Sequence, residues 1–202
     1  SLAVVSIKNG FPSYSFHRND TAERKVNLEN LLDILPINAK IFHVGSLGLI
    51  EGQDAEVWEK FFKICKQKGL ITSLDPNVRP ILIQDRKNYI KRLERMFFDV
   101  DILKLSNEDL QWIYPSKSLD QSFEILQSKT KAQLLILTLG EEGSIGKTSN
   151  FEVKISSKKI SDLRDTVGAG DTYMASILNW FVDHKIYNIN LVKNLKKPDL
   201  SS

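Results

Sequence analysis

The amino-acid sequence predicts a three-layer α/β fold in which helices cover both faces of a mostly parallel sheet. Two observations carry this prediction. Strand and helix patterns alternate from about residue 28 to residue 139, and such alternation builds parallel sheets covered by helices. The 202 residues are 42% hydrophobic, which is enough for one α/β domain to bury a core. We therefore expect a single domain over residues 1–202, with a small sheet at its start.

The first eighteen residues predict that small sheet. An apolar run at residues 2–7 is followed by Asn9 and Gly10, and then by an alternating pattern through Tyr14 and Phe16. Asn-Gly supplies the positive φ angles that a tight hairpin turn needs. We expect residues 1–18 to form a two-stranded hairpin, as a second, smaller sheet beside the main one.

The hydrophobic period then changes repeatedly between that of a helix and that of a strand. Helices are predicted at residues 28–35, 54–68, 85–98, around 112 and at 119–127. Strands are predicted at residues 40–44, 70–74, 101–105 and 134–139. A hairpin-like pair follows at residues 144–147 and 151–155, and the apolar positions of residues 169–183 lie on one face of a final helix.

Composition excludes several classes of function. Basic and acidic residues are nearly balanced, 28 against 25, and the basic ones are scattered, so nucleic acid is not an expected partner. No apolar run approaches the roughly 18 residues that cross a bilayer, so we expect no membrane partner. The one cysteine, Cys65, shares helical spacing with Phe61 and Phe62. We interpret it as a buried thiol, which fits a reducing, cytoplasmic setting.

Spacing excludes two familiar nucleotide motifs and a structural metal site. A dinucleotide-binding fingerprint would need glycine at the position of Tyr173. Residues 146–148 resemble the end of a phosphate-binding P-loop, but Glu141 stands where that motif needs glycine, and a strand pattern follows. The three histidines are dispersed without metal-ligand spacing, and we expect His43, in a strand pattern, to be packed.

Polar residues follow each predicted strand of the parallel region. They are Gly45 and Ser46, then residues 75–79, then Lys104, Ser106 and Asp109, then residues 138–140. Ligands of parallel α/β sheets bind at the carboxyl ends of the strands, so these groups are predicted to gather at one edge. Each segment by itself is equally compatible with a simple turn or a hairpin connection.

The most specific single feature is the segment that leads into the final helix. Gly168, Ala169 and Gly170 precede or open this helix, where backbone N–H groups and the helix dipole favour an anion. Asp171, in the first turn, is placed to accept a proton from a hydroxyl whose oxygen attacks a phosphoryl group held there. Taken alone, the segment favours a simpler interpretation, in which Asp171 only complements the helix dipole and the glycines make a tight entry.

Taken together, these segments resemble the ribokinase-like, pfkB-type carbohydrate kinases, and among them the bacterial fructokinases. Residues 165–171 resemble the family's Asp-Thr-x-Gly-Ala-Gly-Asp signature, and residues 73–80 resemble its Asp-Pro-Asn-x-Arg segment. Residues 100–106 resemble its central strand, and residues 137–143 its nucleotide-side loop. Residues 16–24 are similar to a stretch of fructokinases and 2-keto-3-deoxygluconate kinases. The resemblance runs in order over nearly the whole chain. It implies a ribokinase-like fold in which the hairpin of residues 1–18 is part of a small sheet that acts as a lid.

The resemblance also implies catalytic and nucleotide-binding roles. Asp171 would be the base that deprotonates a sugar hydroxyl, and the N–H groups of Gly168, Ala169 and Gly170 would stabilise the transferred phosphoryl group. The residues expected along ATP are Lys104, Ser106, Thr138, Gly140 and Gly143, together with Gly168 and Gly170.

Substrate and metal contacts are implied in the same way. Arg18 and Arg79 are expected to face the sugar or the phosphates, beside Asp171. Mg²⁺ would enter with ATP, largely through phosphate oxygens and water, and Asp109 is a candidate ligand. Asp165, with Thr166, would help to hold a monovalent cation such as K⁺. The family's Asn-x-x-Glu motif stands here as Ser106-x-x-Asp109, a form that favours the fructokinase branch.

The function implied is therefore that of an ATP-dependent sugar kinase, with fructose as the first candidate substrate. A 2-keto-3-deoxygluconate kinase is the alternative within this class, because Arg18 and Arg79 suit a substrate carboxylate. A catalytically inactive, kinase-like interaction module stays open, because we expect the family's N-terminal sugar-binding segment and its C-terminal adenine-side region to be missing from these residues. A homodimer joined through the lid sheet is also left open.

Overall fold

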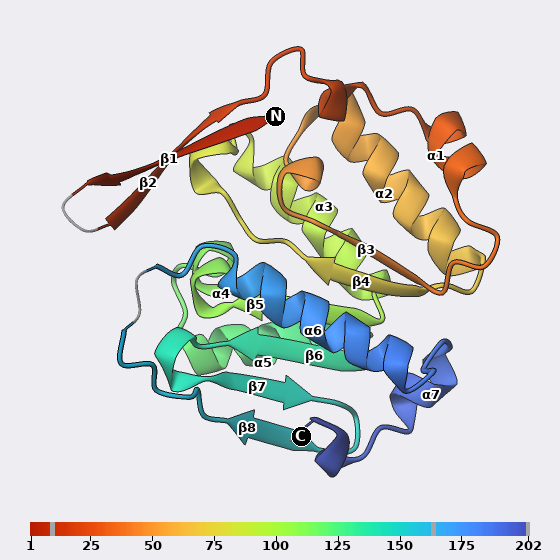
Figure 1. The fold of residues 1–202 in the computed structure, drawn as a ribbon, viewed down its shortest axis with the longest axis vertical. Coiled ribbons are helices and arrows are strands. Elements are labelled where there is room, and N and C mark those ends of the chain that lie inside the picture. The colour runs from red at the N-terminus through yellow and green to blue at the C-terminus, as the bar shows by residue number, and fades with distance from the viewer. Residues whose placement is uncertain (9–10, 163–164, 201–202) are drawn as a thin grey trace.

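A central sheet with helices on both faces and a separate two-stranded hairpin make up the fold (Figure 1). The computed structural model describes residues 1–8, 11–162 and 165–200. The six strands of the central sheet lie in the order β3-β4-β5-β6-β7-β8, which is also their order along the chain. The predicted α/β fold with a mostly parallel sheet is confirmed.

Four parallel strands form the buried half of the central sheet. They are β3 (Ile41–Gly45), β4 (Ile71–Asp75), β5 (Ile102–Ser106) and β6 (Leu134–Thr138). The antiparallel strands β7 (Ser144–Lys147) and β8 (Glu152–Ile155) extend the sheet beyond β6. The parallel strands read as nearly continuous apolar runs because helices cover both of their faces.

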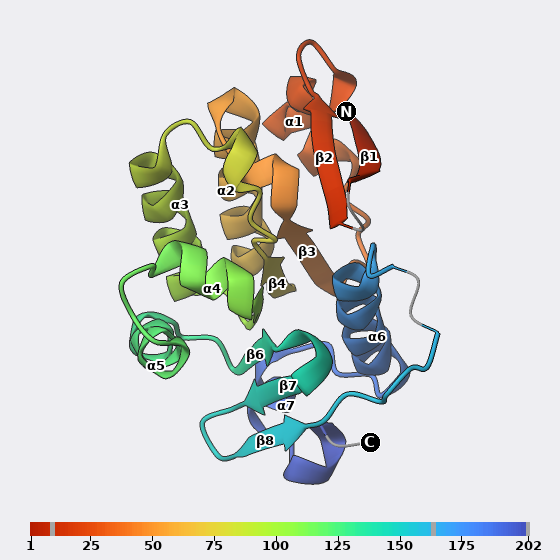
Figure 2. The ribbon, with the colours of Figure 1, turned by 90° about the vertical axis from the view of Figure 1, so that its left-hand side faces the viewer.

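The helices divide unequally between the two faces of the sheet (Figure 2). One face is covered by α2 (Gly52–Gln67), α3 (Arg86–Asp99), α4 (Asn107–Ile113) and α5 (Leu119–Lys129), with α1 (Leu28–Ile34) beside α2. The other face is covered by α6 (Ala169–Asp183) and the short α7 (Ile189–Lys193). The sequence did not predict α7, because five residues are too few to show a helical period.

Short 3-10 helices make the turns between several of these elements. They are η1 (Ala22–Lys25), η2 (Ser46–Leu49), η3 (Pro80–Leu82), η4 (Gly140–Glu142) and η5 (Lys197–Leu200). Of these, η2 follows β3 and η4 follows β6, so both lie at the edge formed by the carboxyl ends of the parallel strands.

The hairpin at the start of the chain pairs β1 (Leu2–Lys8) with β2 (Phe11–His17) in antiparallel register, with Leu2 opposite His17. The predicted turn residues, Asn9 and Gly10, lie outside the described residues. Leu2, Val4 and Val5 are exposed on β1. These three side chains of β1 therefore contribute little apolar burial.

Two separate apolar cores lie on the two faces of the central sheet. Leu74 and Leu103 belong to the core under α2–α5, whereas Ile71 and Ile102 belong to the core under α6. Alternation along each strand explains this division, because successive side chains point to opposite faces. Cys65 of α2 is fully buried as predicted, and burial raises the pKa of its thiol to about 11.

Among the described helices, none has the length and apolar character needed to cross a bilayer.

Candidate active site

A buried ion pair lies where β4 and β5 reach the edge formed by the carboxyl ends of the parallel strands, which we call the active-site edge. The Nζ atom of Lys104 donates to Oδ2 of Asp75 at 2.7 Å, and the two residues are only 3% and 4% exposed. Because Leu74 and Leu103 point into the opposite core, these two side chains face α6. Burial raises the pKa of Asp75, and the Lys104 ammonium opposes that shift. The ion pair therefore lies next to the first turn of α6.

The first turn of α6 lies directly over this pair. Gly168 is the N-cap residue, with a φ of 78° that favours glycine. The first backbone bond of the helix joins the Thr172 N–H to the Gly168 carbonyl at 2.8 Å, and the Ala169 N–H donates to Thr166 at 3.1 Å. A Cβ atom on Gly170 would lie 3.2 Å from Nζ of Lys104, so glycine allows the helix to approach the ammonium.

Asp171 lies in the same turn, with its side chain exposed. Its carboxylate is close enough to the imidazole of His43 to act on the histidine electrostatically. Partial burial of the imidazole lowers the pKa of His43, Asp171 opposes that shift, and Lys104 adds to it. Nδ1 of His43 lies 3.0 Å from Oγ of the fully buried Ser73 on the neighbouring strand. These contacts gather a carboxylate, an imidazole and an ammonium at one end of the α6 face.

Hydrogen bonds to Asp109 join the loop after β4 to the start of α4. Its Oδ1 accepts the Val78 N–H at 2.7 Å, and its Oδ2 accepts the Ser106 N–H at 3.1 Å. Oγ of Ser106 accepts the Asp109 N–H in return, which completes a capping box. Both carboxylate oxygens of this buried residue therefore already hold backbone donors.

The loop after β4, which is hydrogen-bonded to Asp109, contains Asn77 and Arg79. Asn77 has a φ of 40°, and Nη1 of Arg79 donates to the Asn77 carbonyl and side-chain oxygens at 3.1 and 2.6 Å. The Asn77 N–H in turn lies 3.3 Å from Oδ1 of Asp75. The loop is therefore fixed by its own side chains beside the ion pair.

Two glycines allow the backbone conformation of the loop after β6. Gly140 and Gly143 have φ values of 60° and 100°. A Cβ atom on Gly143 would overlap the carbonyl oxygen of Ile155, so only glycine fits there. The Leu139 N–H closes the loop by donating to the Gly143 carbonyl at 2.8 Å. Since Thr138 pairs in register with Ser106, this loop borders the same edge as the ion pair.

A cavity of about 760 Å³ opens between α6 and strands β6–β8. Its lining includes Asp165, Thr166 and Gly168 from the segment that enters α6, and the aromatic Trp180 and Phe181 of α6. This volume is within the range of small-molecule sites. Lys104 and Asp171 are not among its lining residues, so it lies beside the ion pair and not over it.

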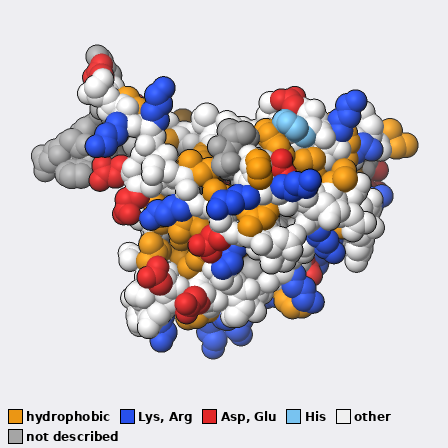
Figure 3. Space-filling model, turned by 90° about the horizontal axis from the view of Figure 1, so that it is seen from below, with side chains coloured by type: hydrophobic (Ala, Val, Ile, Leu, Met, Phe, Trp, Pro, Cys, Tyr) orange, Lys and Arg blue, Asp and Glu red, His pale blue; other side chains and the backbone are white. Residues whose placement is uncertain are grey.

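The same side of the molecule is partly apolar at its surface. Viewed from below β8, orange apolar side chains reach the surface among basic and acidic ones (Figure 3). Ile155 and Val167, which line the cavity, are 38% and 56% exposed. Oδ1 of Asp165 accepts the Val167 N–H at 2.9 Å and so shapes the segment that enters α6.

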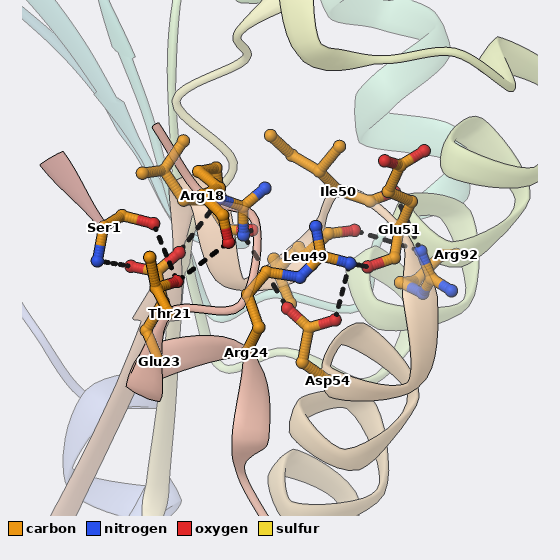
Figure 4. A network of polar contacts seen from close by, with 11 residues as sticks. Ser1, Arg18, Thr21, Glu23, Arg24, Leu49, Ile50, Glu51, Asp54 and Arg92 are labelled. Carbon is orange, nitrogen blue, oxygen red and sulfur yellow. Dashed lines mark hydrogen bonds and ion pairs between the residues drawn. The ribbon is translucent and has the colours of Figure 1, made fainter. Parts of the chain in front are cut away.

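Arg18 lies apart from these groups, at the base of the hairpin (Figure 4). It is only 7% exposed. Its Nε donates to Glu23 at 2.9 Å and its Nη2 to the Leu47 carbonyl at 2.8 Å. The guanidinium is therefore committed to contacts within the protein.

Comparison with known proteins decides the family. The family described as pfkB family carbohydrate kinase matches residues 1–189 of the chain. The chain belongs to this family. The predicted resemblance to pfkB-type carbohydrate kinases is therefore confirmed.

Curated relatives of this pfkB-family chain are named as fructokinases. It is 34% identical over 181 residues to a fructokinase of Rhizobium leguminosarum bv. trifolii, an alignment of 88% of this chain and 53% of the relative. It is 30% identical over 184 residues to the probable fructokinase-2 of Arabidopsis thaliana, or 91% of this chain and 56% of the relative. The chain thus spans about half the length of the curated relatives it matches.

Solved structures show the same fold. An ATP-bound fructokinase from Xylella fastidiosa superposes with a TM-score of 0.85 at 24% identity, over 98% of this chain and 62% of that one. A fructokinase mutant from Vibrio cholerae O395, solved with fructose, ADP and potassium, superposes with a TM-score of 0.74 at 23% identity. That match covers 87% of this chain and 56% of the other.

The structure of this pfkB-family chain brings some of the predicted site residues together and separates others. Lys104 lies against the first turn of α6, which contains Gly170 and Asp171, and Ser106 and Thr138 end neighbouring strands beside them. Asp165 lines the neighbouring cavity and Arg79 folds onto its own loop. The roles assigned to these residues, and to Arg18, Asp109, Gly140 and Gly143, stay predictions.

Sequence reasoning missed three residues of this region. Asp75 was seen as part of a motif but not as the partner of Lys104. His43 was expected to be packed, but it remains accessible because its strand, β3, is at the edge of the sheet. Oη of Tyr173 donates to Oγ of Ser144 at 2.9 Å and ties α6 to β7. A polar residue within an otherwise apolar strand was the available signal for His43.

Proposed function

We propose that the protein transfers the γ-phosphoryl group of ATP to a hydroxyl group of a sugar, with fructose as its first substrate. One observation carries this proposal. The glycine-flanked start of α6 lies over the buried Lys104–Asp75 pair, and Asp171 stands in the same helical turn. Backbone amides, a fixed cation and a free carboxylate are the groups that phosphoryl transfer to an alcohol requires.

The proposed reaction needs one proton transfer and one displacement. Asp171 accepts the proton of the sugar hydroxyl, whose oxygen forms a bond to the γ-phosphorus. The bond between that phosphorus and the bridging oxygen breaks, and ADP leaves. The N–H groups of the first turn of α6, above all that of Gly170, and the Lys104 ammonium oppose the negative charge on the transferred group.

The residues suit a magnesium ion that arrives with the nucleotide. Mg²⁺ bound to ATP would neutralise phosphate charge, and it commonly binds through phosphate oxygens and water. Within the described ranges, no group of three His, Cys, Asp or Glu residues could hold a resident metal. Both oxygens of Asp109 accept backbone N–H groups, which supports a structural part for this residue in addition to its predicted metal contact. Asp165 remains the proposed K⁺ ligand.

Fructose is preferred over an acidic sugar because of Arg18. A substrate carboxylate would have to replace Glu23 or the Leu47 carbonyl on a guanidinium that is nearly inaccessible. A neutral sugar needs no such exchange. The names of the curated relatives support the same choice.

A sugar panel tests the proposal. The full-length protein is incubated with ATP, Mg²⁺ and fructose, or with 2-keto-3-deoxygluconate and other hexoses and pentoses, and ADP release is measured. We expect the highest kcat/KM with fructose. A preference for 2-keto-3-deoxygluconate would reverse the assignment of substrate. Failure with every sugar, from a folded protein that binds ATP, would favour the kinase-like interaction module.

We also propose a cytoplasmic setting and a homodimer formed through the hairpin. The buried, free thiol of Cys65 fits a reducing compartment. Leu2 and Val4 on one face of β1, and Val5 on the other, leave apolar side chains exposed on both faces of the hairpin for contact with a second copy. Sedimentation of the protein and of a Val4→Lys, Val5→Lys variant tests the dimer, which the two lysines should weaken.

A further inference from the structure

Four charged side chains form a compact cluster at the base of the hairpin, which we call the hairpin anchor: Arg18, Glu23, Arg24 and Asp54 (Figure 4). Arg18 immediately follows β2. Its Nε donates to Oε1 of Glu23 at 2.9 Å, and its Nη2 lies 3.7 Å from Oδ2 of Asp54. The anchor therefore joins the end of the hairpin to the first turn of α2.

Asp54 is the centre of the hairpin anchor. It is 2% exposed, and Nη2 of Arg24 lies 3.2 Å from its Oδ1, so one carboxylate pairs with two guanidinium groups. The N-terminal turn of α2 adds a partial positive charge beside it. A buried carboxylate of this kind stays favourable only while its partners are in place, so the two arginines and Asp54 should act as one unit.

The anchor also holds the backbone of η2. Nη2 of Arg18 donates to the Leu47 carbonyl at 2.8 Å. From the other side, Nη1 of Arg92 on α3 donates to the Leu49 and Ile50 carbonyls at 3.0 and 3.1 Å. The segment that follows β3 is thus fixed between the hairpin and α3.

From η2 the contacts continue to the active-site edge. Ser46, with a φ of 51°, donates its N–H to the Pro76 carbonyl at 3.1 Å. Pro76 follows Asp75, the residue that holds Lys104 beneath α6. Two hydrogen bonds, joined by the backbone between Leu47 and Ser46, therefore connect Arg18 to Pro76, the residue next to Asp75 of the buried ion pair.

We propose that Arg18 is a positioning residue, which together with Asp54 fixes the hairpin and η2 against the active-site edge and does not contact the substrate. Its burial, and the engagement of two of its nitrogens by Glu23 and Leu47, carry the inference. The kinetic part of the inference rests on the proposed sugar kinase activity. The structural part does not.

Hydrogen exchange of the full-length protein tests the structural part without any assay of activity. Asp54→Asn keeps the shape of the side chain but removes its charge, and Arg18→Gln removes the guanidinium. We expect either change to speed amide exchange in residues 1–18 and 45–51 by about 10-fold or more, since loss of one partner of a buried pair opens its surroundings. Unchanged exchange in both segments would overturn the proposed role of the hairpin anchor, even if the protein proves to be a sugar kinase.

Arg86→Gln is the matched control. Arg86 is also an arginine that donates to two backbone carbonyls, those of Trp112 and Ile113, but it joins α3 to α4. We expect this variant to leave exchange in residues 1–18 and 45–51 unchanged. Faster exchange in these segments in Arg86→Gln would show that they respond to any loss of stability, which would contradict a specific role for Arg18 and Asp54.

Kinetics separate a positioning residue from a sugar contact. We expect Asp54→Asn and Arg18→Gln to reduce kcat/KM for the sugar to similar extents, and the double variant to be about as active as either single one. If Arg18 bound the sugar directly, Arg18→Gln would raise KM for the sugar while Asp54→Asn stayed near the unaltered protein, and the two effects would add. That result would overturn the proposal.

Discussion

The two faces of the central sheet differ at the end where the strands stop. Under α2–α5 the face is apolar to the end of the strands, where Leu105 is fully buried. Under α6 the apolar core ends with residues such as Ile102, and His43, Ser73, Asp75 and Lys104 take over beyond it. Burying an ion pair contributes little stability compared with apolar packing. We infer from this difference that the first face maintains the fold, whereas the far end of the second is the place of the proposed chemistry.

The largest expected effect concerns the carboxylate on α6. Asp171→Asn should lower kcat by about 10²–10⁴-fold, the usual contribution of a general base, while ATP binding and thermal unfolding stay nearly unchanged. Steady-state kinetics and calorimetry measure both. Asp183→Asn, at the other end of the same helix, is the control and should keep its activity. Near-normal turnover by Asp171→Asn would remove Asp171 from the proposed mechanism.

The next effect concerns the buried ion pair. Lys104→Met leaves Asp75 buried without its partner and should lower the free energy of unfolding by about 3–5 kcal/mol as well as abolish activity. Adding Asp75→Asn should recover much of the stability but none of the activity. Denaturant unfolding and kinetics check the two parts. Recovery of activity in the double variant would mean that the pair is only structural.

Apolar residues of β5 next to Lys104 should affect the stability of the protein and not its activity. Leu103→Ala, on the α2–α5 face, and Ile102→Ala, on the α6 face, should each lower the free energy of unfolding by about 2–5 kcal/mol. Activity per folded molecule should be retained at a temperature where the variants are folded. Ile102 and Leu103 directly precede Lys104 on the same strand. A loss of activity per folded molecule in either alanine variant would contradict the inference that the apolar residues maintain only the fold.

The smallest effect is a pH dependence that arises from His43. Because its pKa in the folded protein is lowered from the usual value of 6.5, the unfolded chain binds a proton first as the pH falls. The stabilisation is present above pH 6.5 and is lost as the pH falls through the folded-state pKa. His43→Gln should therefore flatten the acid side of the stability curve. Thermal unfolding between about pH 5 and pH 8 measures this, and an unchanged slope would speak against it.

Local patterns were sufficient for most of the fold. Residues 52–67 and 86–99 carry long helical periods, and the parallel strands are short apolar runs between turn residues, so both were predicted close to their true bounds. The short α7 and the 3-10 helices were missed because they are defined by a few hydrogen bonds and not by a period. Boundaries that depend on capping, such as Ser106 before α4, also required the structure.

By itself the sequence determined the order of the elements, the family and the segment from Gly168 to Asp171, because each depends on residues that are neighbours along the chain. Only the tertiary structure decided that Lys104 pairs with Asp75 and that Arg18 is engaged at the base of the hairpin. These partners are separated by 29 residues, a distance over which no local period operates. The register of parallel strands and the packing of the intervening helices bring them together.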